Sequence, residues 1–134
     1  MDDASRDRFD AMLERVLGDM PRALLALLDE VPVIVLDEPT AELLQSLGVP
    51  REQWEEEAAG LCGLHSGHSV LDHSVEHSGE LPEQIHLFRR GIVQMAGGWD
   101  RPREIEEEIR VTLLHEIGHH FGLEEDDLDG LGYA

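Results

Sequence analysis

The sequence contains no lysine and no asparagine, and it has a single cysteine, Cys62. Without lysine, neither Schiff-base catalysis nor a serine–lysine dyad can be built from the side chains of this chain. Without asparagine, a cysteine–histidine–asparagine arrangement is excluded as well. One cysteine cannot form an internal disulfide, and its surroundings, Gly60-Leu61-Cys62-Gly63-Leu64, indicate a buried strand rather than an activated thiol. These absences narrow the catalytic chemistry open to the chain.

Positive charge is also scarce, because 10 basic residues, all arginine, face 30 acidic ones and the formal net charge is −20. Such a surface repels nucleic acids and anionic membranes, so a basic or neutral polypeptide partner fits better. No stretch approaches the roughly 18 apolar residues of a membrane span, and Met1–Ser5 lack the apolar run of a secretory signal. We therefore expect one cytoplasmic domain spanning residues 1–134.

The most informative segment is His115-Glu116-Ile117-Gly118-His119, which has the pattern H-E-x-x-H. Residues four apart lie on one helix face, so the two imidazoles can bind a single cation, usually zinc. A metal there lowers the pKa of a bound water to about 7, and Glu116 is placed to accept the proton of that water. The segment predicts metal ligands at His115 and His119 and a general base at Glu116. The alternative is a solvated helix face that carries two histidines.

Catalytic zinc keeps three protein ligands and one open position, so a third ligand is expected. Gly122 can adopt the left-handed conformation that ends a helix and would turn the following acidic residues back toward the metal. The spacing repeats the register H-E-x-x-H-x-x-G-x-x-H, with Glu125 at the position of the last histidine. Glu125 is the preferred third ligand and Asp126 the second choice; the remaining alternatives are Glu124, Asp127 and an ordinary solvated tail.

Periodicity along the rest of the chain predicts an α+β fold, with a small mixed sheet of about three strands packed against an active-site helix and N-terminal helices. We expect the active-site helix to run from Arg103 to about Phe121 and to bury one apolar stripe. The other predicted helices are 6–20, 21–28 and 41–47; the predicted N-caps are Ser5, Thr40 and Asp100. The stripe consists of Ile105, Ile109, Leu113 and Ile117, and His120 points away from the metal face as a structural or supporting residue.

Three short runs predict the strands, namely Val31–Leu36, Leu61–His65 and Gln84–Arg90. In the last run polar and apolar residues alternate, and two arginines end it. This pattern favours an edge strand able to hold a substrate peptide by main-chain hydrogen bonds. The segment Ser66–Pro82 predicts a loop beside the cleft. Its histidines, His68, His73 and His77, match no compact chelate, so a solvated polar loop is favoured over a second metal site.

His115–Glu125, together with Leu87–Arg90 and Val31–Pro39 upstream, resembles the small bacterial zincin-like metallopeptidases. These minimal zincins, also described as acidic metallopeptidases, carry H-E-x-x-H-x-x-G-x-x-E, and the resemblance covers most of the chain. It implies an α+β zincin-like domain in which His115 and His119 bind zinc, Glu125 is an acidic third ligand and Glu116 is the base. Two departures from the metzincin pattern stand out: no methionine follows His119 to form a Met-turn, and an acid replaces the third histidine. Candidates for stabilising the oxyanion are Tyr133, Arg89 or a loop histidine.

The leading hypothesis is therefore a zinc metallopeptidase that hydrolyses peptide bonds of a peptide or protein substrate through a metal-activated water. A second hypothesis is a non-catalytic, metal-stabilised protein-binding module with a closed site of four ligands. A third is an acidic interaction protein in which the motif is incidental. The sequence favours the first, because the motif lies within an apolar helix and is followed by a glycine three residues after its second histidine.

Overall fold

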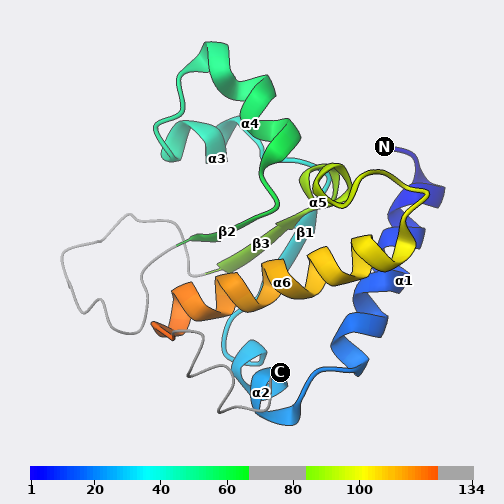
Figure 1. The fold of residues 1–134 in the computed structure, drawn as a ribbon. Coiled ribbons are helices and arrows are strands. Elements are labelled where there is room, and N and C mark those ends of the chain that lie inside the picture. Colours follow the sequence, from blue (N-terminus) through cyan, green and yellow to red (C-terminus); the bar gives the residue numbers. More distant parts are fainter. Residues whose placement is uncertain (67–83, 124–134) are drawn as a thin grey trace.

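The computed structural model describes residues 1–66 and 84–123 of the chain. Helices alternate with short strands along these residues, and the longest helix, α6, comes last (Figure 1). The elements are α1 (Asp3–Gly18), α2 (Arg22–Leu28), β1 (Val33–Leu36), α3 (Ala41–Ser46), the 3-10 turn Arg51–Gln53, α4 (Trp54–Gly60), β2 (Gly63–Ser66), β3 (Gln84–Phe88), α5 (Arg89–Ala96) and α6 (Pro102–Phe121). The mixed α and β content agrees with the fold class expected from the sequence.

The three strands form one mixed sheet in the order β1-β3-β2. Strand β1 pairs with β3 in parallel, with Val33 opposite Ile85, and β2 pairs with β3 in antiparallel, with Leu64 opposite His86. The prediction that residues 84–90 form an edge strand is therefore wrong, because β3 is the central strand. The polar position of the apolar–polar alternation, His86, does not face solvent, because this residue is only 5% exposed.

The two arginines that follow β3 also differ from the prediction, since Arg89 and Arg90 begin α5 instead of extending the strand. Arg89 donates hydrogen bonds to Asp37 at 2.9 Å and to Asp10 at 3.0 Å. Asp37 also accepts from Arg6 at 2.7 Å. This ion-pair network joins α1, the end of β1 and the start of α5, and within it Arg89 neutralises nearby carboxylates.

Helix α6 runs across the sheet, and α1 packs near its N-terminal part (Figure 1). The predicted apolar stripe of α6 is confirmed, because its four isoleucine and leucine side chains are fully buried; they are Ile105, Ile109, Leu113 and Ile117. Burying a side chain of this kind contributes about 1.5–3 kcal/mol relative to leaving it exposed. Packing of this stripe in the core therefore fixes the rotation of α6 about its own axis. That rotation determines which other residues of α6 face the strands β2 and β3.

The ends of the helices show which capping predictions were right. Thr40 caps α3 as predicted, since its hydroxyl accepts from the Leu43 N–H at 3.1 Å. Ser5 does not cap α1; the helix starts earlier because Asp2 accepts from the Ser5 N–H at 2.9 Å. Asp100 is one residue too early for α6, whose N-cap position is Arg101 and whose first residue is proline. No helix within 1–66 or 84–123 is long and apolar enough to cross a membrane.

Candidate metal centre

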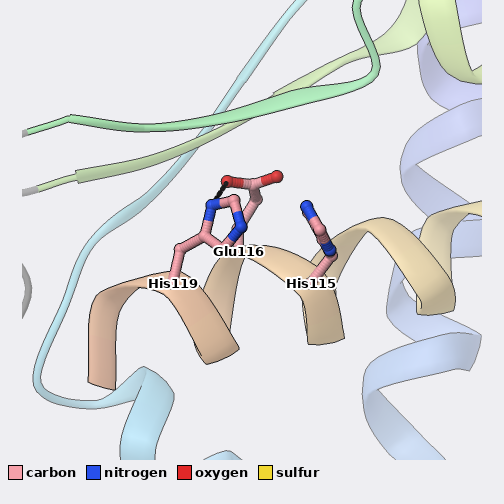
Figure 2. A group of neighbouring side chains, drawn as sticks. All are labelled: His115, Glu116 and His119. Atoms are coloured by element: carbon pink, nitrogen blue, oxygen red, sulfur yellow. Dashed lines mark ion pairs between the residues drawn. The ribbon is translucent and has the colours of Figure 1, made fainter. Parts of the chain in front are cut away.

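The side chains of His115, Glu116 and His119 gather on the side of α6 that faces the strands (Figure 2). The ring centroids of the two histidines are 4.2 Å apart, and the ring planes are inclined by 56°. This proximity follows from the sequence, because side chains four residues apart on a helix lie one turn above each other. One ligand atom of each of the three residues lies within 4.8 Å of those of the other two.

The three residues differ in their exposure to solvent. The Glu116 residue is 6% exposed, whereas the side chain of His119 is 57% exposed, and His115 is also exposed. In Figure 2 the carboxylate of Glu116 lies on the strand side of the two rings, with its Oε1 atom 3.6 Å from Nδ1 of His119. That separation is too long for a hydrogen bond. The cluster thus combines a shielded carboxylate with two imidazoles that a solvent-borne ion can reach.

The protonation state of His119 favours binding of a cation. Burial of the ring, followed by the nearby His115, lowers the pKa of His119 below its ordinary value of 6.5. The ring is therefore neutral at neutral pH, and a neutral imidazole is the form that coordinates a metal. Its 3.6 Å contact with Glu116 is then an approach between a carboxylate and a neutral ring, not an ion pair.

Strand β2 lies against α6 at this cluster, through a glycine that the sequence analysis did not single out. A Cβ atom on Gly63 would be 2.6 Å from Cγ2 of Thr112 and 3.3 Å from Cγ of Glu116. A glycine inside a predicted strand, here Leu61–His65, is a signal for such a close approach of two segments, so this residue could have been found. The contact places the backbone of an edge strand directly over the stem of Glu116.

A pocket of about 350 Å³ opens next to the cluster, between the segment Gly60–Gly63 and the exposed side of α6. His115 and Glu116 form one end of the pocket, and Glu108 belongs to its helix wall. A cleft is thus present beside the active-site helix. Its second wall is the segment that leads into β2, and not the strand at residues 84–90 that was expected to hold a substrate. A group bound in this pocket can therefore reach His115 and Glu116.

The chain turns back at the end of α6 as the sequence predicts. Gly122 is left-handed with φ 66° and ψ 32°. The N–H of Leu123 donates to the carbonyl of Gly118 at 2.8 Å, and a Cβ on Gly118 would be 3.2 Å from the Leu123 carbonyl oxygen. Leu123 therefore lies against the helix at Gly118. The candidate third ligands, Glu124, Glu125, Asp126 and Asp127, lie outside the described residues, as do His68, His73, His77 and Tyr133.

Two other residues named from the sequence can be placed. Arg89 was named as an oxyanion stabiliser, but its ion pairs with Asp10 and Asp37 hold its guanidinium against α1 and β1, away from the histidine pair. His120 is 3% exposed and packs edge-on against Phe121 at 4.5 Å, which agrees with a structural role.

Cys62 does not have the properties of an activated nucleophile. Burial raises the pKa of its thiol to about 11, and the carboxylates of Glu108 and Glu116 contribute to the same shift. A thiol with that pKa is almost wholly protonated at neutral pH, and the thiolate is the reactive form. The expectation that Cys62 is not catalytic agrees with this environment.

The donor chemistry of the cluster fits a divalent metal ion. Imidazole nitrogens and a carboxylate oxygen are the ligand types that zinc prefers besides thiolates. The two imidazoles, of His115 and His119, are exposed and closely spaced on one helix, and the carboxylate of Glu116 is shielded next to them.

Comparison with known proteins supports this assignment at the family level. No curated protein matches the sequence. The family model for zincin-like metallopeptidases matches residues 28–133, a segment that includes the whole sheet, α6 and the acidic C-terminal residues. The family implies a bound metal ion. The match covers most of the 134 residues, and the chain therefore belongs to the zincin-like metallopeptidase family.

Proposed function

We propose that this protein is a zinc-dependent metallopeptidase that hydrolyses peptide bonds, with His115, His119 and Glu125 as metal ligands and Glu116 as the general base. The observation that carries the proposal is the convergence of His115, Glu116 and His119, whose ligand atoms all lie within 4.8 Å of one another at the end of an open pocket. When bound, zinc supplies Lewis acidity, which acidifies water and polarises a carbonyl group.

The geometry of the helix end supports Glu125 as the third ligand. Gly122 reverses the chain, and Leu123 is already hydrogen-bonded back to Gly118, one residue before His119. Two further residues can advance the chain by at most about 7 Å from Leu123. This reversal favours an acidic ligand among the residues that follow Leu123, and a carboxylate is a ligand type that zinc accepts. Asp126 is the alternative that a direct metal-ligand analysis would distinguish.

The position of Glu116 suits proton transfer. Its carboxylate is shielded from solvent beside the two imidazoles, so it can take a proton from the attacking water and deliver it to the amine nitrogen of the departing peptide half. The helix holds the stem of Glu116, and β2 limits its movement from above through Gly63. A preorganised base of this kind needs little rearrangement during the reaction.

The alternative of a non-catalytic metal-stabilised binding module predicts a closed site in which protein groups fill every coordination position. The two exposed imidazoles and the adjoining pocket favour the hydrolase, because they leave an approach for a substrate. The alternative would be preferred if zinc proved to have four protein ligands and no water.

The test compares the wild-type protein with Glu116→Gln in a peptide-library digest with one equivalent of zinc. We expect Glu116→Gln to keep its zinc and to lose about 10²–10⁴-fold in cleavage rate, the usual contribution of a positioned base. Glu107→Gln is the matched control, because it removes the same charge from the same helix at an exposed residue that pairs with Arg110. Cleavage by Glu116→Gln at the wild-type rate would contradict the assigned base.

A further inference from the structure

The pocket beside the candidate metal centre has an acidic residue, Glu108, on its wall two helical turns from His115. Glu108 precedes His115 by seven residues, which corresponds to about 10 Å along the helix axis. Both residues line the same pocket, together with Val111 between them and with Leu61 and Cys62 on the opposite side. A group bound next to His115 can therefore extend along the pocket to the Glu108 carboxylate.

Glu108 differs from the two glutamates that precede it. Glu106 faces Arg15 at 3.4 Å, and Glu107 faces Arg110 at 2.9 Å. Glu108 has no cationic partner within residues 1–66 and 84–123, and no arginine is among the residues that line the pocket there. Its half-buried carboxylate thus gives the pocket a negative charge that the neighbouring protein groups do not offset.

The rest of the pocket suits a long hydrocarbon stem. Val111 is 43% exposed, which is unusual for a large apolar side chain in this fold, and it lies on the wall between Glu108 and His115. Leu61 lies on the facing wall. Arginine and lysine side chains combine an apolar stem with a charged end, so they cover apolar surface while their charge reaches a carboxylate.

We propose that this pocket is the specificity subsite of the peptidase and that it binds a basic side chain of the substrate, whose cationic end pairs with Glu108. The inference rests on the proposed function, because it assigns the substrate class of the same site. In this proposal Glu108 determines specificity, because it contacts a side chain of the substrate and does not contact the scissile bond. The large negative charge of the whole chain acts in the same direction, since a net charge of −20 attracts basic peptides.

The single cysteine allows the charge preference of the pocket to be measured without catalysis. Cys62 lines the pocket and is the only thiol of the chain. Its thiolate attacks a methanethiosulfonate, forms a mixed disulfide and releases methanesulfinate. The ratio of its rates with a cationic trimethylammonium reagent and an anionic sulfonate reagent is independent of the thiol pKa, because both reactions use the same thiolate. We expect a ratio well above that of free cysteine, falling on the order of tenfold in Glu108→Gln and little in the control Glu107→Gln.

Binding is tested with two peptides that differ only in arginine or its uncharged isostere citrulline, on the Glu116→Gln protein loaded with zinc. The arginine peptide should protect Cys62 from neutral methyl methanethiosulfonate at a concentration at least tenfold lower than the citrulline peptide needs. A further Glu108→Gln substitution should abolish that difference, and a further Glu107→Gln substitution should retain it. Equal protection by both peptides, or a cationic-to-anionic ratio that Glu108→Gln leaves unchanged, would overturn the inference.

Cleavage of the same two peptides separates this inference from the proposed function. A higher kcat/KM for the arginine peptide, lost in Glu108→Gln and reversed toward a glutamate peptide in Glu108→Arg, would support both. Cleavage of both peptides at equal rates would overturn the subsite alone. If neither peptide is cleaved although the arginine peptide protects Cys62, the hydrolase fails while the basic-group pocket stands.

Discussion

Gly63 on β2 lies so close to α6 that a Cβ atom at this residue would be 2.6 Å from Cγ2 of Thr112. The same atom would be 3.3 Å from Cγ of Glu116 and 3.1 Å from the carbonyl oxygen of His86. The edge strand and the helix that carries the candidate base therefore meet without room for a methyl group. Because protein interiors are packed closely, the position of β2 fixes the position of Glu116.

The first prediction concerns this contact. Gly63→Ala should destabilise the protein by about 1–3 kcal/mol, because the added methyl group forces β2 and α6 apart. Displacing the stem of Glu116 should also lower peptide cleavage by a larger factor than it lowers zinc affinity. Urea unfolding and kcat/KM on one peptide measure both effects.

A second substitution tests whether the Thr112 methyl group causes the effect. Thr112→Ser removes Cγ2 and keeps the hydroxyl, so it should recover part of the stability lost in Gly63→Ala. Gly18→Ala is the control, since nothing lies within 4 Å of the Cβ it adds, and it should change stability by less than about 1 kcal/mol. If Gly63→Ala unfolds at the same urea concentration as the wild type, the close contact is not real.

The second prediction concerns the ion-pair network that holds α1, β1 and α5 together. Asp37 accepts from Arg6 and from Arg89, whose side chain is only 11% exposed. Asp37→Asn leaves that guanidinium without part of its charge compensation and should destabilise the fold by about 1–3 kcal/mol. Glu38→Gln is the matched control, because Glu38 pairs with Arg90 at the exposed surface and should matter by less than about 1 kcal/mol.

The difference in free energy of unfolding between Asp37→Asn and the wild type should also depend on pH. The hydrogen bond from Arg6, opposed in part by burial, lowers the pKa of Asp37 below 3.8. A carboxylate whose pKa is lowered by folding stabilises the native state above its unfolded pKa and loses that effect as the pH falls through its folded pKa. The difference should therefore be full at pH 7 and shrink below about pH 3.8. A difference that is constant down to pH 2 would contradict the ionic contribution.

The third prediction concerns His86 in the central strand. Burial lowers the pKa of this imidazole below 6.5. The unfolded state then binds more protons than the native state as the pH falls below about 6.5, so the free energy of unfolding of the metal-free protein should decrease there. His86→Gln removes this titration, and its urea midpoint should fall less between pH 7.5 and pH 5.5. Parallel pH profiles for the two proteins would show that His86 does not titrate as a buried ring.

Much of the site follows from sequence spacing. The four-residue interval between His115 and His119 guarantees their proximity once α6 forms, and the buried isoleucine stripe makes α6 form where it does. The glycine at position 122 gives the expected left-handed end. These features depend on residues within one helix, and local periodicity predicts such features well.

Features that depend on tertiary pairing were not predicted. A short apolar run gives no direct information about its neighbours in a sheet, so the sequence predicts an edge strand where the structure has the central strand β3. The burial of His86 and the placement of Arg89 in an ion-pair network both depend on elements far away in the sequence. The wall of the pocket at Gly60–Gly63 has the same origin, since only the fold brings this segment to α6.

Zinc binding measured by equilibrium dialysis and metal analysis tests the central claim most directly. We expect one zinc per chain in the wild type, in Glu116→Gln and in the control His73→Ala. We expect substoichiometric zinc in His115→Ala and in His119→Ala at the same free zinc concentration, because each removes one of the paired imidazoles. Equal zinc content in His119→Ala and the wild type would contradict the account, and so would the absence of bound zinc from the wild-type protein.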